Sequence, residues 1–245
     1  MRFSNKTVII TGGAGGIGLA VASRFASEGA NIVLADISIE QLTKGAEALK
    51  SNGFNSVWLS QCDVSNEQQV QATVSGAIDH FGSIDIIVNN AGLMIFKKLE
   101  ETSGADWNRI LNVDLIGAFY FTKYAFLSMK EGGCIINISS IHAVETTPMV
   151  STYAAAKAAL LSLTRSSSIE GKAKGIRVNA ILPGAIDTPM LWENPNIKAG
   201  IEQLNKDSVG KPEDIAGVVA FLASADAGFV QGAMIEVDGG RLNRL

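Results

Sequence analysis

The sequence has little cysteine, little proline and no excess of basic residues. Its two cysteines, Cys62 and Cys134, lie far apart in apolar segments, with no histidine or further cysteine at metal-ligand spacing nearby. They are predicted to be buried free thiols, and no metal is expected in the chemistry. The net charge is −4 and the basic residues are scattered, so nucleic acid is not an expected partner.

Long apolar runs are also missing. No stretch approaches the ~20 residues that a bilayer span requires, and the start of the chain lacks the apolar core and cleavage site of a secretory signal. We therefore expect a cytoplasmic protein without a membrane partner. Hydrophobic residues make up 47% of the chain and charged residues 18%, which indicates a compact globular protein rather than a disordered one.

Short runs rich in Val and Ile are abundant, and amphipathic stretches such as 17–29 and 67–82 separate them. Apolar strands joined by helices require a parallel sheet covered on both faces. The sequence therefore predicts a doubly wound α/β Rossmann fold, as one domain spanning 1–245, with a lid or substrate loop around 188–211. The seven predicted strands are 7–11, 31–35, 56–60, 84–89, 134–139, 176–182 and 234–238.

A glycine-rich turn, TGGAGGIG at 11–18, joins the first predicted strand to a helix, which is the setting of a dinucleotide-binding turn. Gly12 permits the tight turn, Gly16 lets the backbone approach a pyrophosphate, and Gly18 lets the helix pack on the strand. The free N–H groups at the helix start favour an anion. An ordinary strand-to-helix turn is the alternative interpretation.

An acidic residue, Asp36, ends the second predicted strand, where it could accept hydrogen bonds from both ribose hydroxyls of an adenosine. A 2′-phosphate would meet like charge there, so NAD is favoured over NADP as cofactor. The alternative is that Asp36 only caps the next helix, a role that Ser38 could fill equally well.

Tyr153 and Lys157 stand four positions apart in YAAAK, so they share one face of a predicted helix. A tyrosine has a pKa near ~10, and a neighbouring ammonium lowers it toward the range needed for acid/base work. Ser140, after the fifth strand, could donate a hydrogen bond to a substrate oxygen. Taken alone, the pair could also be an ordinary surface contact.

At this point the sequence resembles the classical short-chain dehydrogenases/reductases over essentially its whole length. The resemblance rests on motifs in order: TGGAGGIG (11–18), DV (63–64), NNAG (89–92), Asn112, Ser140, Tyr153 with Lys157, PG (183–184) and VDGG (237–240). It implies that Tyr153 is the general acid/base, that Ser140 positions the substrate oxygen, and that Lys157 holds the nicotinamide ribose. It also implies that Asn112 helps to hold a water for proton relay.

The resemblance further implies a cofactor-binding set. Asp63 would meet the adenine, and Asn89 and Gly92 would line the cofactor, although turn capping is an open alternative for Asp63 and Asn89. The full set is Gly12, Gly16, Ile17, Gly18, Asp36, Asp63, Val64, Asn89, Ala91, Gly92, Tyr153, Lys157, Pro183, Gly184, Ile186 and Thr188. A strand order of 3-2-1-4-5-6-7 and a homotetramer are implied as well. Enoyl reductases, with a wider Tyr to Lys spacing, and extended epimerases do not fit.

Two further segments, SSIHAV and PGAIDTPM, partly resemble bacterial glucose 1-dehydrogenases, in which His142 would face the substrate. An acidic residue expected soon after NNAG is missing, because LMIFKK at 93–98 stands there. The alternative for His142 is a loop histidine facing water or another subunit.

The sequence thus predicts an NAD-dependent oxidoreductase acting on a secondary alcohol or its ketone, with sugars and cyclic polyols among the candidates. A 3-oxoacyl thioester reductase is the rival enzyme, and a dinucleotide sensor without turnover is the alternative outside enzymes. The sensor is disfavoured because Tyr153 and Lys157 are both present.

Overall fold

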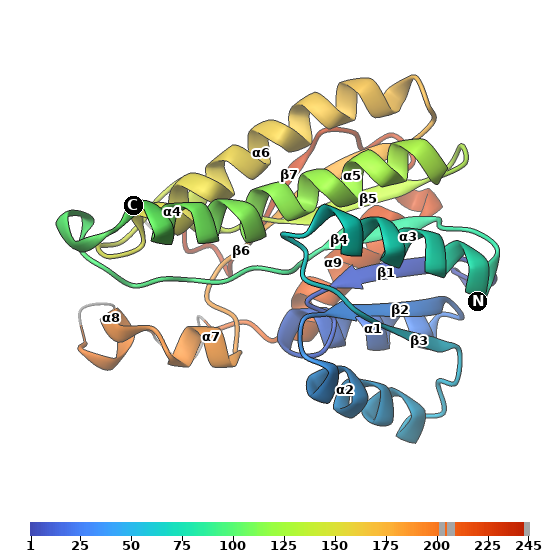
Figure 1. The fold of residues 1–245 in the computed structure, drawn as a ribbon, viewed down its shortest axis with the longest axis horizontal. Helices are drawn as coiled ribbons and strands as arrows, with labels where there is room; N and C mark the ends of the chain where they lie inside the picture. The colour runs from blue at the N-terminus through green and yellow to red at the C-terminus, as the bar shows by residue number, and fades with distance from the viewer. Residues whose placement is uncertain (201–203, 205–208, 243–245) are drawn as a thin grey trace.

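The computed structural model describes residues 1–200, 204 and 209–242. Its centre is a seven-stranded sheet in the order β3-β2-β1-β4-β5-β6-β7, with every neighbouring pair parallel (Figure 1). The predicted fold and strand order are therefore confirmed. The strands are β1 Thr7–Thr11, β2 Asn31–Asp36, β3 Val57–Gln61, β4 Ile86–Asn89, β5 Cys134–Ile138, β6 Arg177–Pro183 and β7 Met234–Val237.

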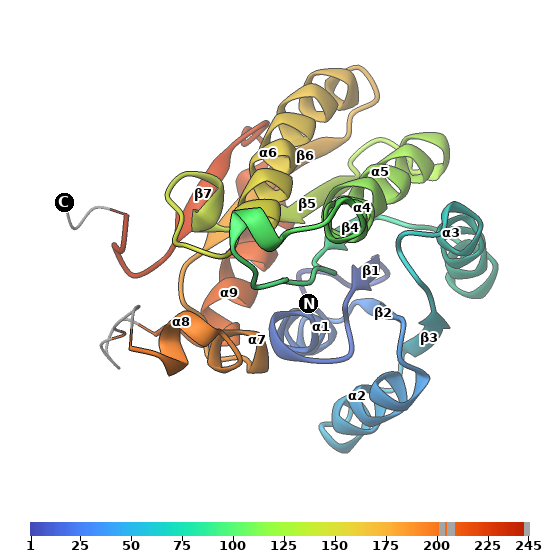
Figure 2. The same cartoon turned by 60° about the vertical axis from the view of Figure 1, so that its left-hand side comes forward.

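Helices cover both faces of the sheet. Figure 2 shows α3 (Glu67–Phe81), α5 (Gly117–Ser128) and α6 (Ser151–Lys172) on one face, and α1 (Gly16–Ser27) and α2 (Ile39–Ser51) on the other. The last long helix, α9 (Pro212–Ala223), packs against α1. Each face has its own apolar core, as expected for strands that are apolar on both sides.

Side chains at the helix starts explain where the helices begin. Ser38 accepts a hydrogen bond from the N–H of Gln41 at the start of α2, and Asn66 accepts from two N–H groups at the start of α3. Ser103 and Asp106 cap α4 (Gly104–Leu111) reciprocally. These residues satisfy N–H groups that would otherwise have no partner in the first turn.

The segment 104–128 consists of α4, a π-helical turn at Asn112–Ile116 (η2) and α5. Contrary to the expectation that no stretch approaches the length of a bilayer span, this segment is long and apolar enough to cross a membrane by length and composition alone, a test that core helices of globular proteins also pass. Its inner face packs against α3, β4 and α6, and Phe121 is fully buried there. The packing accounts for the apolar composition.

The predicted lid begins with two short helices, α7 (Pro189–Trp192) and α8 (Pro195–Lys198). Residues 201–203 and 205–208 of the predicted lid lie outside the described residues. The described residues also include three short 3-10 turns: η1 Leu99–Glu101, η3 Ile141–Ala143 and η5 Ala225–Ala227.

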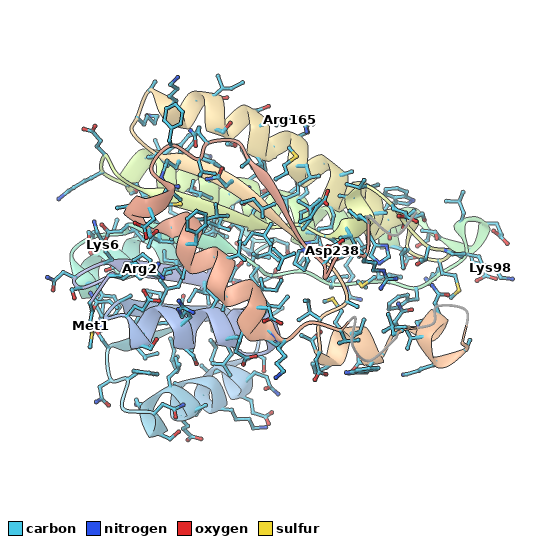
Figure 3. The ribbon with its side chains drawn as sticks, turned by 180° about the vertical axis from the view of Figure 1, so that it is seen from behind. Met1, Arg2, Lys6, Lys98, Arg165 and Asp238 are labelled. Carbon is cyan, nitrogen blue, oxygen red and sulfur yellow. The ribbon has the colours of Figure 1, made fainter. Side chains whose placement is uncertain are left out.

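The two ends of the sheet carry different segments. Figure 3 shows Arg2 and Lys6, before β1, at one end of the molecule and Lys98, in the segment after β4, at the other. The glycine turn follows β1, and the segments with Ser140 and with Thr188 follow β5 and β6. In open α/β sheets the carboxyl ends of the strands are where ligands bind.

Candidate active site

Two connected cavities lie at the carboxyl ends of the strands. The glycine-turn cavity has a volume of 380 Å³ and is lined by the turn at 12–17, Asp36 and residues 90–92. The smaller Tyr153 cavity, 110 Å³, is lined by Ser140, His142 and Tyr153. Both share Ile17, Tyr153, Thr188 and Met190 in their lining. Tyr153 therefore stands between them.

The glycine turn has the backbone conformation that its sequence predicts. Gly12 and Gly16 have φ values of 59° and 50°, which residues with a side chain rarely adopt. A Cβ on Gly18 would collide with the carbonyl oxygen of Gly12, so only glycine lets α1 approach β1 this closely. Asn90, which the sequence reasoning missed, fixes the turn by donating to the carbonyls of Thr11 and Gly12, at 3.0 and 3.1 Å.

Asp36 also lines the glycine-turn cavity. Its carboxylate accepts from the N–H of Ala14 at 3.4 Å and from the N–H of Ser38 at 3.1 Å. Ser38 is the N-cap of α2, so the capping alternative for Asp36 is not needed to start that helix. The carboxylate is only half-buried and lines the cavity, where further donors can reach it.

The helix α6 brings Tyr153 and Lys157 together, as their spacing predicts. The Nζ atom of Lys157 lies 5.5 Å from the centre of the Tyr153 ring and donates to the carbonyl of Ile138 at 3.1 Å. Both side chains are buried, at the carboxyl end of β5. Ser140 follows that strand, is 6% exposed, and lies with Tyr153 in the wall of the smaller cavity. The three predicted catalytic residues on β5 and α6 thus form one cluster.

A carboxylate joins this cluster. Asp114, in the π-helical turn, has an Oδ2 atom 3.2 Å from Nζ of Lys157, and its side chain is fully buried. Its Oδ1 atom accepts from the N–H of Leu93 at 3.0 Å. The sequence reasoning chose Asn112 instead, two positions earlier, whose side chain is exposed to solvent. The structure does not bring the side chain of Asn112 to the cluster, and the predicted contact of Asn112 with a relay water stays a prediction.

Burial dominates the pKa of Tyr153. Removal of the phenol from water raises the pKa, Lys157 lowers it, Asp114 raises it again, and the hydrogen bond with Ser140 lowers it. The pKa of Tyr153 ends above its usual value, so the lowering expected from Lys157 is real but outweighed. Burial lowers the pKa of Lys157, yet Asp114 and Tyr153 raise it beyond this effect, which keeps the ammonium charged.

Several predicted cofactor residues do line the cavities. Ala91 and Gly92 belong to the glycine-turn cavity, and Pro183, Gly184 and Ile186 to the Tyr153 cavity. Met94 from the predicted apolar mouth also lines the Tyr153 cavity, as does Arg241, which the sequence reasoning did not consider. Arg241 follows a turn in which the carboxylate of Asp238 accepts from two backbone N–H groups.

Three predicted residues lie in structural positions instead. Asn89 is buried and donates to Asn137 at 2.8 Å, inside the protein rather than in a cavity wall. Asp63 accepts from the N–H and hydroxyl of Ser65, which is the turn role left open for it. Val64 is buried against Gly117. Cofactor contacts from these residues stay predictions.

His142 lies beside the cluster. Its ring centre is 6.0 Å from that of Tyr153, in an edge-on arrangement, and its side chain is half-buried in the wall of the Tyr153 cavity. Its Nδ1 atom is 3.4 Å from the hydroxyl of Thr146. This position is compatible with the predicted contact to substrate.

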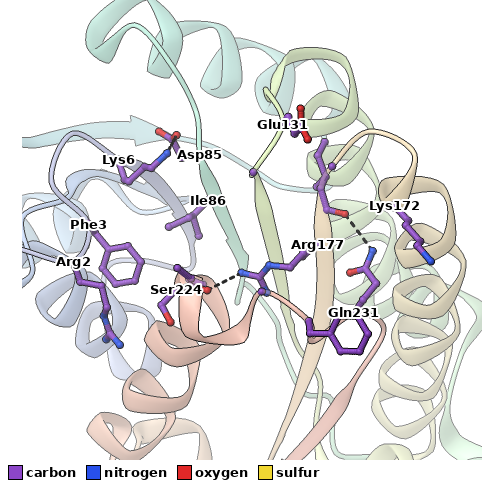
Figure 4. A pocket seen from close by; sticks show the side chains of 17 residues that line it. Arg2, Phe3, Lys6, Asp85, Ile86, Glu131, Lys172, Arg177, Ser224 and Gln231 are labelled. Atoms are coloured by element: carbon purple, nitrogen blue, oxygen red, sulfur yellow. Dashed lines mark hydrogen bonds and ion pairs between the residues drawn. The ribbon is translucent and has the colours of Figure 1, made fainter.

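A cavity of 740 Å³ lies at the opposite end of the sheet (Figure 4). Several of its charged groups are engaged with one another or with the backbone, since Lys6 pairs with Asp85 at 2.8 Å and Arg177 donates to the carbonyl of Ser224 at 3.2 Å. No acid/base pair comparable to Tyr153 and Lys157 lines it among the described residues. Its size alone does not make it the catalytic site.

Comparisons with known proteins show which family this chain resembles along its length. A family model described as enoyl-(acyl carrier protein) reductase matches residues 12–241. The meso-2,3-butanediol dehydrogenase of Serratia marcescens is 37% identical over 243 residues, 98% of this chain and 96% of that protein. Glucose 1-dehydrogenase 2 of Bacillus subtilis is 36% identical over 248 residues, 97% of this chain and 95% of that protein. The crystal structure of a levodione reductase matches with a TM-score of 0.92 and 37% identity, covering 100% of both chains.

Proposed function

Because the chain belongs to the short-chain dehydrogenase/reductase family, and so is an oxidoreductase acting on CH–OH groups, we propose that it uses NAD and a compact secondary alcohol or its ketone. The single observation that supports this most is the Ser140, Tyr153 and Lys157 cluster at the junction of the two cavities. One cavity has the lining for a dinucleotide, and the other has room for a small substrate.

The glycine-turn cavity fits a dinucleotide on its own geometry. Gly15 has open space where a Cβ would be, and a Cβ on Gly12 would meet Ala91 and Asn90 at 3.0 Å. Backbone N–H groups at the start of α1 suit a pyrophosphate. The Asp36 carboxylate suits two ribose hydroxyls and repels a 2′-phosphate, which supports NAD over NADP.

Proton transfer follows from the cluster. The bound nicotinamide would supply the hydride chemistry. In alcohol oxidation, the ionised oxygen of Tyr153 takes the hydroxyl proton of the substrate, and in ketone reduction the phenol returns a proton to the carbonyl oxygen. Ser140 orients that oxygen, and Lys157 stabilises the phenolate while contacting the nicotinamide ribose.

The substrate is proposed to be small and largely apolar. The Tyr153 cavity has a volume of 110 Å³, and Met94, Ile141 and Leu191 form much of its wall. The relatives named for butanediol and glucose oxidation both belong to the same class of reaction. A sugar fits less well than a short diol or a small ring, because no carboxylate lines this cavity among the described residues.

A 3-oxoacyl thioester reductase remains the rival, and cofactor choice separates the two. The match to an enoyl reductase model does not carry that activity, because Tyr153 and Lys157 stand only one helical turn apart, with Ser140 beside them.

A homotetramer and a cytoplasmic location belong to the same proposal. Large apolar side chains are exposed on three outer helices and near β7: Phe119 and Leu127 on α5, Ile169 on α6, Phe221 on α9, and Phe229. Such surfaces suit contact with other copies of the chain. The two buried free thiols suit a reducing compartment.

The test is a substrate panel of short diols, cyclic alcohols and sugars with NAD and NADP, following reduced nicotinamide. NAD should support turnover far better than NADP. The Asp36→Ala variant should raise the KM for NAD about 10-fold to 100-fold, because hydrogen bonds to a charged group are lost. Glu40→Ala, which removes an exposed carboxylate paired with Lys44 on α2, is the matched control. A silent panel or a strong preference for NADPH would contradict the proposal.

A further inference from the structure

Asp114 is a buried carboxylate that the proton transfer above does not use. Its side chain is 0% exposed, and that of Lys157 is 4% exposed. The Oδ2 atom forms an ion pair with Lys157 rather than an aligned hydrogen bond, while Oδ1 accepts from the N–H of Leu93. A charge buried so completely is costly unless it is paired, so the ammonium and the carboxylate depend on each other.

Local structure explains why this residue, and not a neighbour, faces Lys157. Successive helical residues are about 100° apart, so positions 112 and 114 point to nearly opposite sides of the segment. The π-helical turn at Asn112–Ile116 therefore turns Asp114 inward and leaves Asn112 outside. Gly92 completes the arrangement, because a Cβ there would lie 2.9 Å from Oδ2 of Asp114 and 3.3 Å from Nζ of Lys157.

From the phenol of Tyr153, the ion pair presents two opposite charges. The ammonium is 5.5 Å from the ring centre and favours the phenolate, while the carboxylate behind it opposes the phenolate. The other groups that face Tyr153 are the hydroxyl of Ser140 and the ring of His142. With the carboxylate present, Lys157 cannot act on the phenol with its full charge.

Other charged groups on the packed elements are engaged at the surface. On α4, Asp106 pairs with Lys97 at 2.8 Å, and Arg109 is exposed to solvent. On α5, Lys123 pairs with Glu67 at 2.6 Å. These groups lie on solvent-facing sides of the segment and do not enter the buried cluster.

We propose that Asp114 is a positioning residue, the counter-ion of Lys157 that sets the pH range of proton transfer by Tyr153. By balancing the ammonium it keeps the phenol protonated at neutral pH. The enzyme is then ready to give a proton to a ketone near neutrality, and it gains alcohol oxidation activity as the pH rises. This inference rests on the proposed function in one respect, namely that Tyr153 is the acid/base.

A purely structural role for Asp114 makes a different forecast. Its bond to Leu93 anchors the segment after β4, so its loss could lower stability or raise KM. A structural role alone would leave the pH dependence of the reaction unchanged. The pH profile is therefore the readout that separates the two roles.

The first experiment titrates the phenol directly, without substrate. The chain has three tyrosines, so the difference in ultraviolet absorbance between the protein and its Tyr153→Phe variant isolates Tyr153. The unaltered protein should ionise this phenol above the ordinary value of about 10, and Asp114→Asn should lower the midpoint by about one pH unit. Ionisation below about pH 8 in the unaltered protein without cofactor, or an unchanged midpoint in the variant, would overturn the proposal.

The second experiment measures kcat/KM for alcohol oxidation against pH. Asp114→Asn should move the rising limb about one unit toward acid, and so increase kcat/KM about fivefold one unit below the original midpoint and up to about tenfold at lower pH. Asp106→Asn, which alters a carboxylate on α4 that pairs with Lys97, should leave the pH of the rising limb unchanged. If the Asp114→Asn variant does not fold, the ionisation midpoint of Tyr153 in the unaltered protein still tests the proposal. Absence of turnover on every substrate would contradict the proposed function and leave the titration interpretable, so the two failures are distinguishable.

Discussion

The two ends of the sheet hold cavities that differ in how their charges are arranged. At the amino ends of the strands the cavity has a volume of 740 Å³, and in its wall Lys6 pairs with Asp85 and Arg177 donates to a backbone carbonyl. At the carboxyl ends the cavities are smaller, 380 and 110 Å³, yet a phenol, an ammonium and a carboxylate are buried together there. The proposed catalytic site is therefore identified by its cluster of buried ionisable side chains and not by the size of its cavity.

Helix direction is one physical reason for the difference. In this fold the helix starts, with free N–H groups and partial positive charge, gather near the carboxyl ends of the strands, and the helix ends gather at the opposite side. Arg177 at the amino end of β6 satisfies such a helix end by donating to the carbonyl of Ser224, the residue that follows α9. That cation stabilises the fold, whereas Lys157 at the other end is buried beside Tyr153 and paired with Asp114.

The largest expected effect is at the reactive end. Tyr153→Phe removes the proton donor and acceptor while keeping the ring that packs on the cluster, so kcat should fall about 10²-fold to 10⁴-fold. The melting temperature should stay nearly unchanged, because only the hydroxyl and its bond to Ser140 are lost. Activity in the variant equal to that of the parent would end the assignment of the acid/base.

A second change tests the turn that forms the cofactor wall. In Gly18→Ala the new methyl group would collide with the carbonyl of Gly12, so the turn must move away from its dinucleotide-binding shape. We expect a loss of about 1–3 kcal/mol in the free energy of unfolding and at least about tenfold weaker binding of NAD, measured by denaturation and by titration calorimetry. Gly104→Ala, where nothing lies within 4 Å of the new Cβ, should be neutral in both measurements.

A third change tests the other end of the comparison. Arg177→Met removes the donor to Ser224, and it should lower the free energy of unfolding by about 1–3 kcal/mol, the range for hydrogen bonds to charged groups. The kcat and the KM for NAD should remain those of the parent. Lys172→Met, an exposed neighbour in the same cavity wall, is the matched control and should change neither quantity. A large loss of kcat in folded Arg177→Met protein would remove the proposed division between the two ends.

The sequence was sufficient for the fold because strand runs, glycine turn and helix periods are local signals that all agree. Tyr153 and Lys157 were also predictable, since helical spacing alone places them together. The ion pair of Asp114 was not predictable, because helical spacing with the buried Ile110 places Asp114 on an inner face but does not show that Lys157, on another helix, meets it there. The hydrogen bond from Asn89 to Asn137 was not predictable for a similar reason, because Asn137 stands on another strand and the pairing is visible only in the sheet.

The smallest expected effect concerns Cys134, the first residue of β5, at the amino end. Burial raises the pKa of this thiol to about 11 from 9.0, so the folded chain keeps a proton that the unfolded chain releases. This difference in pKa contributes at most about 2–3 kcal/mol to the free energy of unfolding. The contribution is fully present below about pH 9 and is lost as the pH rises toward about 11. Because lysines and tyrosines titrate in the same range, the measurement is the difference between the parent and Cys134→Ala in denaturant unfolding at several pH values. The parent should lose stability more steeply than the variant between pH 9 and 11. Parallel curves would mean that the thiol ionises as easily in the folded chain as in the unfolded one, contrary to its burial.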